Sequence, residues 1–319
     1  MSLDDESSFS WSEILEASNA LDEGNLVAFP TETVYGLGAD ACNRQAVARI
    51  YSVKGRPIDH PLIVHIHSIA GLAPWVNQPP QFAIQLANTF WPGPLTLVLK
   101  RSTLAQDFIT GGQDSVGIRV PNHPAALALL ESFHNRGGRG VVAPSANRFG
   151  GVSPTTANAV RDELSQYLRF EDLIIDGGQC EIGIESTIID CTNSHPRILR
   201  SGAISKKMIN ECTGLEVSEA TGTSIRVSGS LESHYAPKAA VVLDQIPKTG
   251  EGYIAMETHE TPLGVIRLAA PSNNEEFAQC LYAALHEADV REIETVVVRQ
   301  PKGEGISIAI RDRLRRASN

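Results

Sequence analysis

The stretch LVAFPTETVYGLG, residues 26–38, decides the fold class of this chain. Its first four residues are a short apolar run, which predicts a buried β-strand that ends at Pro30. Amphipathic helices are predicted on either side, over 11–23 and 43–53. A buried strand between two such helices indicates an α/β domain.

The alternation of strands and helices continues along the chain. Further strands are predicted over 61–66, 95–99, 116–120 and 140–143, and further helices over 80–90, 124–133 and 156–165. A second series follows, with strands over 239–243, 263–268 and 295–299 and helices over 274–288 and 307–316. The segment between the two series is rich in Ser, Gly and Thr and has no apolar period. We therefore predict a first domain over 1–220, a linker over 221–238 and a small α/β domain over 239–319.

The composition limits the classes of function. The chain has 319 residues, 42% of them hydrophobic, and a net charge of −10. A protein that grips nucleic acid over a broad face carries a basic excess, so stable binding to nucleic acid is not expected. No apolar run is long enough to span a membrane, and residues 1–12 lack the pattern of a signal peptide. A cytoplasmic protein with no membrane partner is the expectation.

Residues 30–38 carry hydroxyls and glycines between a strand and a helix, where α/β sheets place ligands. Gly36, Gly38 and Ala41 fit the spacing of a dinucleotide-binding loop. The strand is predicted to end too early for that motif, because its glycines must form the turn from strand to helix. A ligand-binding stretch of another kind is the better interpretation.

Three other polar groups stand beside predicted strands or helices. KGRP, residues 54–57, places two cations around a glycine at the end of a helix, which can bind an anion or complement the helix dipole. PSAN, residues 144–147, puts two short polar side chains after a strand. Arg119 lies within an apolar strand. A buried arginine there needs an anionic partner, which can be a group of a ligand or the side chain of an acidic neighbour.

The cysteines give no sign of a disulfide framework or a metal centre. Their number is odd, five, and none forms a C-x-x-C pair. Cys180, Cys191 and His195 match no common zinc spacing, so no protein-held metal is predicted.

Taken together, these motifs resemble a known family. PTETVYGLG, KGRP followed by PLIVHI, and PSAN followed by SPT occur in the order found in the YrdC-type threonylcarbamoyl-AMP synthases. The resemblance covers roughly 11–212. The region after HYAP, down to AIRDRLRRAS, resembles the long, two-domain form of the family. It implies a twisted mixed-sheet domain followed by a small Rossmann-like α/β domain.

The resemblance also implies a reaction and a set of site residues. The family combines L-threonine, bicarbonate or CO2, and Mg2+-bound ATP into threonylcarbamoyl-AMP and pyrophosphate, and downstream transfer proteins use the product for threonylcarbamoyladenosine (t6A) in tRNA. This makes it a nucleotidyltransferase. The ATP-binding residues would be Lys54, Arg56, Ser145, Asn147, Thr155, Arg200 and Tyr235, with Lys54 and Arg56 also catalytic. The L-threonine pocket would be formed by Thr33, His65, Arg119 and Ser186.

Other functions stay open at this point. YrdC-like domains also occur as RNA-binding modules and within larger enzymes that carbamoylate a metal-cluster maturation protein. The last predicted helix carries Arg311, Arg313, Arg315 and Arg316, and a solvated helix face is the simplest interpretation of that charge run. The linker departs from the family pattern, because residues 229–233 replace a basic, aromatic run before HYAP.

Overall fold

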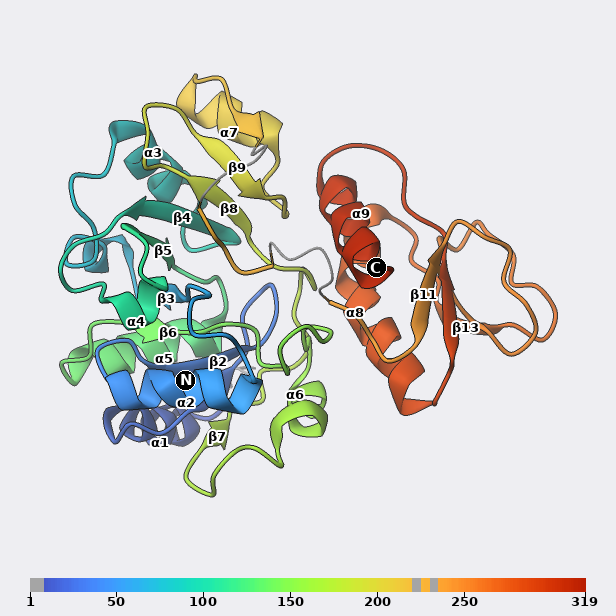
Figure 1. The fold of residues 1–319 in the computed structure, drawn as a ribbon, viewed down its shortest axis with the longest axis horizontal. Helices are drawn as coiled ribbons and strands as arrows, with labels where there is room; N and C mark the ends of the chain where they lie inside the picture. The colour runs from blue at the N-terminus through green and yellow to red at the C-terminus, as the bar shows by residue number, and fades with distance from the viewer. Residues whose placement is uncertain (1–8, 220–224, 230–234) are drawn as a thin grey trace, which may run out of the picture.

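Two sheets organise the chain (Figure 1). In the residues that this computed structural model describes, 9–219, 225–229 and 235–319, they have ten and four strands. The first sheet contains, in spatial order, β10 (Ser218–Glu219), β9 (Arg197–Arg200), β8 (Thr187–Asp190), β4 (Leu95–Lys100), β5 (Ser115–Arg119), β3 (Ile63–His65), β6 (Val141–Val142), β2 (Gly36–Asp40), β1 (Val27–Phe29) and β7 (Leu173–Ile174).

This first sheet is mixed, as predicted. Strands β3 and β5 are parallel, and so are β4 and β8, whereas β4 and β5, β1 and β2, and β8 and β9 are antiparallel. The helices of this part are α1 (Trp11–Asp22), α2 (Arg44–Lys54), the 3-10 turn η1 (Ile69–Gly71), α3 (Gln81–Phe90), α4 (Asp107–Thr110), α5 (Pro124–Asn135), α6 (Ala157–Leu164) and α7 (Lys206–Thr213).

Local sequence explains why the first helices begin where they do. Ser10 and Glu13 form a capping box at the start of α1. The side chain of Asn43 accepts hydrogen bonds from the backbone of Gln45 and Ala46 at the start of α2. Both helices agree with their predicted ranges to within a residue or so. The capping box was not part of the sequence prediction.

The glycine-containing part of residues 30–38 forms a strand that was not predicted. Gly36 and Gly38 lie in β2, which forms an antiparallel pair with β1. A Cβ on Gly38 would stand 2.8 Å from Phe29 and 2.9 Å from Val141, so the strands can pack this closely only because the residue is glycine. The dinucleotide-loop interpretation is excluded, since these glycines do not connect a strand to a helix.

The second sheet is entirely parallel, which confirms the predicted small Rossmann-like α/β unit. Its order is β11 (Ala240–Leu243), β14 (Thr295–Val298), β12 (Gly252–Ile254) and β13 (Ile266–Ala269). The helices α8 (Asn274–Val290) and α9 (Ile306–Ala317) lie on the side of this sheet that faces the first sheet (Figure 1). Strand β12 was missed, because three residues are too short a run to show a period.

The predicted linker falls only partly within the described residues, since 221–224 and 230–234 lie outside them. In the described part, the guanidinium of Arg226 donates hydrogen bonds to the carbonyls of Asp59 and Gly111 in the first domain. The domain boundaries at 220 and 238 therefore stay a prediction. No helix within the described ranges is both long and apolar enough to cross a membrane.

Candidate active site

Most of the predicted site residues line one cavity. They are Thr33, Arg56, His65, Arg119, Ser145, Ser186, Arg200 and Tyr235. The same cavity is also lined by Val34, Ile63, Ala143, Pro144, Glu185, Ser228 and Gly229. Residues that are far apart in sequence therefore meet at a single place.

The sheet brings these residues together at the ends of its strands. His65 ends β3 and Arg119 ends β5, and the two are direct partners in the parallel pair. Ser186 immediately precedes β8, while Arg200 ends β9 and pairs with Ile188. Strand ends are the usual place for ligands in open α/β sheets.

Arg119 is the cation at one end of the cavity. Its Nη2 donates a hydrogen bond to Thr33 Oγ1 at 2.9 Å and lies 2.7 Å from Glu32 Oε2. The contact with Glu32 is close but poorly aligned, because neither carboxylate oxygen of Glu32 has a hydrogen-bond partner among the described residues. Arg119 thus has an acidic neighbour, which was one of the two anions expected for it, and it also lines the cavity where a ligand could bind. This arrangement leaves it able to bind a second carboxylate.

His65 faces the same end of the cavity as a neutral ring. Burial and the nearby charge of Arg119 lower the pKa of His65 to about 3. Its Nδ1 is buried and has no hydrogen-bond partner among the described atoms. The side chain can therefore offer a hydrogen bond to a ligand, but it carries no positive charge near neutral pH.

Arg200 and Ser186 form a fixed polar pair on another wall. The guanidinium of Arg200 donates two hydrogen bonds to Ser186. Its Nε donates to the Ser186 carbonyl at 3.0 Å, and its Nη2 donates to Ser186 Oγ at 3.1 Å. Its Nη1 donates to the carbonyl of Ser228 at 2.9 Å. The Ser186 hydroxyl also hydrogen-bonds Thr96 Oγ1 at 2.8 Å. These contacts hold both side chains in one orientation before any ligand binds.

Arg56 and Lys54 come from the predicted KGRP clamp, but only Arg56 lines the cavity. Helix α2 ends at Lys54, and Gly55 takes the left-handed C-cap conformation with a φ of 63°. Arg56 donates to the carbonyl of Pro61 at 3.0 Å and to Ser228 Oγ at 3.1 Å. Burial lowers its pKa to about 10, so it stays charged.

Lys54, Asn147 and Thr155 lie behind the cavity wall. The Lys54 ammonium donates to the carbonyl of Ser145 at 2.5 Å and to that of Asn147. Burial and the neighbouring charge of Arg56 lower the pKa of Lys54 well below its usual value. Thr155 is buried, and its carbonyl accepts a hydrogen bond from the backbone of Cys180. In this conformation Lys54 supports the loop at 144–147 and does not face the cavity.

The second domain supplies contacts that the sequence analysis missed. Glu185 lines the cavity, and its carboxylate accepts hydrogen bonds from Ser153 at 2.6 Å, Tyr282 at 3.0 Å and Arg313 at 2.7 Å. Burial opposes ionisation of Glu185, but the charges of Arg313 and Arg200 outweigh it and lower its pKa to about 2.

Arg313 shows that the solvated-face interpretation of the last helix was wrong for this residue. Its side chain is 1% exposed, whereas that of Arg315 is 68% exposed. The spacing gave a usable signal. Arg313 precedes the apolar Leu314, which is also buried, and it lies three residues after Ile310 on the buried face of α9.

Described residues of the predicted linker line the cavity. Tyr235 is 1% exposed, and its ring stacks on that of Tyr282 with centroids 5.8 Å apart. Gly229 has a φ of 82°, and a Cβ there would stand 2.0 Å from the Tyr235 hydroxyl oxygen. The enclosed space is about 50 Å³. Typical ligand pockets measure roughly 300–1,000 Å³, so this conformation is a closed one.

The cysteine and metal predictions involve other parts of the chain. Cys180 and Cys191 are buried free thiols, and burial raises the pKa of Cys180 to about 12. His195 is exposed and hydrogen-bonds Ser194. Within the described ranges, no group of three or more His, Cys, Asp or Glu residues is arranged to hold a metal ion.

Known proteins match both parts of the chain. A family model for the Sua5, YciO and YrdC proteins, described as "Telomere recombination", matches residues 19–202. A model described as "Threonylcarbamoyl-AMP synthase, C-terminal domain" matches residues 204–319.

Curated relatives and solved structures extend over nearly the whole chain. The threonylcarbamoyl-AMP synthase of Pyrococcus abyssi is 39% identical over 95% of this chain and 93% of its own length. The threonylcarbamoyl-AMP synthase of Bacillus subtilis is 36% identical over 98% of this chain and 95% of its own length. The crystal structure of P. abyssi Sua5 complexed with L-threonine matches with a TM-score of 0.86 and 36% identity, covering 96% of this chain and 94% of that one. Because these matches together span nearly the whole chain, including both domains, the chain belongs to the two-domain threonylcarbamoyl-AMP synthase family.

Proposed function

We propose that the chain is an L-threonylcarbamoyladenylate synthase, a nucleotidyltransferase that forms threonylcarbamoyl-AMP and pyrophosphate from L-threonine, bicarbonate or CO2, and ATP. The observation that carries the proposal is the position of Arg119 and Arg56 on one cavity, with the hydroxyls of Thr33 and Ser186 beside them. Two cations on one cavity can hold an amino-acid carboxylate and a nucleotide phosphate next to each other. The P. abyssi relative has been solved with L-threonine.

Arg119 is the proposed site for the threonine carboxylate. Its Nη2 has a close but misaligned contact with Glu32, so a well-aligned ligand carboxylate can form a stronger, bidentate pair. Thr33 and Ser186 would then hydrogen-bond the amino group and the hydroxyl of threonine. The neutral ring of His65 suits the apolar and uncharged part of this pocket.

The chemical step is a nucleotidyl transfer. The threonine amine adds to CO2 with loss of a proton, and an oxygen of the resulting carbamate attacks the α-phosphorus of ATP. The bond from that phosphorus to the bridging oxygen breaks, and pyrophosphate leaves with the electron pair. Arg56 and Arg200 would offset the charge on the phosphates, and Ser145, Asn147, Thr155 and Tyr235 would bind the nucleotide. Mg2+ would enter as the ATP complex, carried by the phosphates.

Lys54 needs a change of partner to act in this reaction. It now donates to two backbone carbonyls of the loop at 144–147. A phosphate entering beside that loop would be a stronger acceptor than a carbonyl, and it would also favour the charged form of the lysine. The closed cavity likewise has to open, so Ser228, Gly229 and Tyr235 must move for ATP to enter.

The product would serve t6A formation in tRNA through downstream transfer proteins in the cytoplasm. The direct test is mass spectrometry of the product after incubation with ATP, L-threonine and bicarbonate. We expect threonylcarbamoyl-AMP and one equivalent of pyrophosphate. Arg56→Ala and Lys54→Ala should each lower kcat by roughly 10²–10³, by analogy with losing one preorganised donor. Unchanged threonine-dependent pyrophosphate release in both variants would contradict the assigned roles.

Amino-acid specificity tests the threonine pocket separately. Serine lacks one methyl group, which is worth about 1–3 kcal/mol, and valine cannot replace the hydroxyl hydrogen bond. The expected order of kcat/KM is threonine, then serine, then valine. Arg119→Lys keeps the charge but loses the bidentate geometry, so it should raise KM for threonine more than KM for ATP. Equal use of all three amino acids would rule the pocket out.

A further inference from the structure

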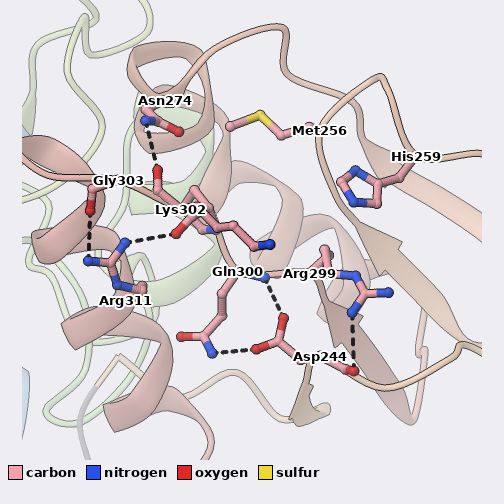
Figure 2. A pocket seen from close by; sticks show the side chains of 10 residues that line it. Asp244, Met256, His259, Asn274, Arg299, Gln300, Lys302, Gly303 and Arg311 are labelled. Atoms are coloured by element: carbon pink, nitrogen blue, oxygen red, sulfur yellow. Dashed lines mark hydrogen bonds between the residues drawn. The ribbon is translucent and has the colours of Figure 1, made fainter.

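The second domain contains a larger cavity than the candidate active site. It has a volume of about 890 Å³, within the roughly 300–1,000 Å³ of typical small-molecule sites. Figure 2 shows the side chains around it. They belong to Asp244, Met256, His259, Asn274, Arg299, Gln300, Pro301, Lys302, Gly303 and Arg311. None of these residues lines the candidate active site, so the two cavities are separate.

The cavity lies at the carboxyl edge of the parallel sheet. Asp244 directly follows β11, Arg299 directly follows β14, and Met256 lies just after β12. These strands are neighbours in the order β11-β14-β12. From β14 the chain continues into α9, and from β12 it continues to β13. This is the position where open α/β sheets bind their ligands.

The loop from β14 to α9 contains two glycines with positive φ angles. Gly303 has a φ of 106° and Gly305 a φ of 66°, which side chains rarely allow. Gly305 is also the N-cap of α9 and provides no side chain to the first free N–H groups of that helix. A loop of this kind before a helix favours an anion.

Arg299, Lys302 and Arg311 line the crevice, and they differ in whether their charged groups are already bound by the protein. Arg311 is structural, because it donates to the carbonyls of Pro301 at 2.8 Å and Gly303 at 3.0 Å and so fixes the loop. Lys302 is exposed, and no contact of its ammonium with another described residue is found. In Figure 2 its side chain extends toward the middle of the cavity.

Arg299 has an unsatisfied guanidinium nitrogen beside the crevice. Its Nε is buried and has no hydrogen-bond partner among the described residues, and its Nη1 reaches only the carbonyl of Asp244 at 3.4 Å. A buried guanidinium nitrogen with no acceptor is costly unless an anion completes it.

The carboxylate of Asp244 offsets one of these positive charges, but its hydrogen bonds are formed with Gln300. Its Oδ1 accepts the backbone N–H of Gln300 at 2.9 Å, and its Oδ2 accepts the side-chain amide of Gln300 at 2.7 Å. Asp244 also has a left-handed φ of 56°, a strained conformation for a residue other than glycine. The crevice is therefore basic within a chain whose net charge is −10.

We propose that this crevice binds a small phosphate-bearing ligand of about nucleotide size. Arg299 and Lys302 would contact the phosphate. Met256 and His259 line the wider part of the cavity, where an apolar or aromatic portion of the ligand would lie. The proposal concerns the second domain alone and does not depend on the activity proposed for the first.

Binding to the full-length protein tests the proposal. AMP, pyrophosphate and inorganic phosphate are titrated separately by calorimetry into the wild type, Arg299→Ala/Lys302→Ala and Arg56→Ala. We expect one binding component that the double variant weakens by at least roughly tenfold and that Arg56→Ala leaves unchanged, since two charge-assisted contacts are removed. Tighter binding of AMP than of the two inorganic anions would identify a nucleotide ligand, and equal binding would identify a free anion.

A matched set of single variants keeps the test independent of folding. Lys302→Ala should weaken binding, Lys302→Arg should restore it, and Lys248→Ala, at an exposed lysine of the same domain outside the cavity, should have no effect. Threonine-dependent pyrophosphate release should be equal in all three. If no probe binds the wild type at a site sensitive to Arg299 or Lys302, the crevice is an empty groove and the proposal is wrong.

Discussion

Arg313, in the last helix of the second domain, donates a hydrogen bond of 2.7 Å to Glu185, in the wall of the cavity of the first domain. Their side chains are 1% and 8% exposed, so the ion pair is buried. The same guanidinium donates to the carbonyl of Ser201 and lies over the ring of Tyr235, 5.1 Å from its centroid. The second domain therefore forms part of the support of the candidate active site.

Arg313→Ala should strongly destabilise the protein. It would leave the carboxylate of Glu185 buried without its cation, and breaking a buried pair in this way costs about 3–5 kcal/mol. Glu185 would keep only its hydrogen bonds from Ser153 and Tyr282, so this wall of the cavity would be held less firmly and threonine-dependent turnover should fall. Urea unfolding and pyrophosphate release measure the two effects.

Arg315→Ala is the matched control on the same helix, because the Arg315 side chain is exposed and its one hydrogen bond among the described residues is to Asp312. An exposed pair is worth about 0.2–1 kcal/mol, so little change is expected. Adding Glu185→Gln to Arg313→Ala should recover part of the lost stability, since no buried charge is then left unpaired. Equal stability of Arg313→Ala and Arg315→Ala would show that the buried pair has no structural role.

Tyr282→Phe probes the other contact that the second domain makes with Glu185. The variant removes one hydrogen bond to the carboxylate, of 3.0 Å, and keeps the ring that stacks on Tyr235. A hydrogen bond to a charged group is worth about 1.5–3 kcal/mol, so the loss of unfolding free energy should be smaller than in Arg313→Ala. Urea unfolding at constant pH measures it. A larger loss than in Arg313→Ala would mean that the tyrosine, rather than the ion pair, holds the two domains together.

The sequence predicted most of the helices because their signals are local. Asn43 is a residue type that caps helices, and the apolar faces of α1 and α8 repeat at helical spacing. The strands that were missed or misplaced are short, or their pairing depends on distant partners. Strand β2 contains Gly36 and Gly38, which have low strand propensity, and it forms only because β1 and β6 pair with it on either side.

The residues of the candidate site could be predicted where they belong to a recognisable sequence motif. Thr33, Arg56 and Ser145 belong to sequence motifs, and all three line the cavity. Contacts between the domains left no such signal, because Glu185 and Arg313 are separated by 128 residues and meet only in the folded chain. The place of Lys54 behind the wall also depends on the conformation of the loop at 144–147, which the sequence does not reveal.

Gly229→Ala should impair the candidate site through Tyr235. The new Cβ would stand 2.0 Å from the tyrosine hydroxyl oxygen, and the φ of 82° adds backbone strain. Displacing a residue that lines the cavity should lower kcat/KM for ATP on the order of tenfold to a hundredfold. Steady-state kinetics with varied ATP measures this.

Gly250→Ala is the control for the backbone strain alone. Its φ of 87° is similar, but nothing lies within 4 Å of the added Cβ. It should lose about 1–2 kcal/mol of stability and keep its kinetic constants. If both alanine variants have the same kcat/KM, the contact between Gly229 and Tyr235 does not matter for catalysis.

His65 should make the protein sensitive to mild acid. In the unfolded chain its pKa is about 6.5, whereas in the fold it is about 3. The unfolded state therefore binds a proton between these two values and the folded state does not. Stability is fully present above pH 6.5 and falls as the pH drops toward 3, by up to about 5 kcal/mol for this group.

His65→Asn should remove this part of the acid sensitivity while keeping a polar side chain of similar size. Between pH 7.5 and 5, the free energy of unfolding in urea should fall less steeply in this variant than in the wild type. Some slope should remain, because burial also lowers the pKa values of His60, His67 and His123. His195→Asn changes an exposed histidine and should follow the wild-type curve. If His65→Asn follows that curve as well, His65 accepts a proton in the folded state, and a cationic ring rather than a neutral one faces the cavity beside Arg119.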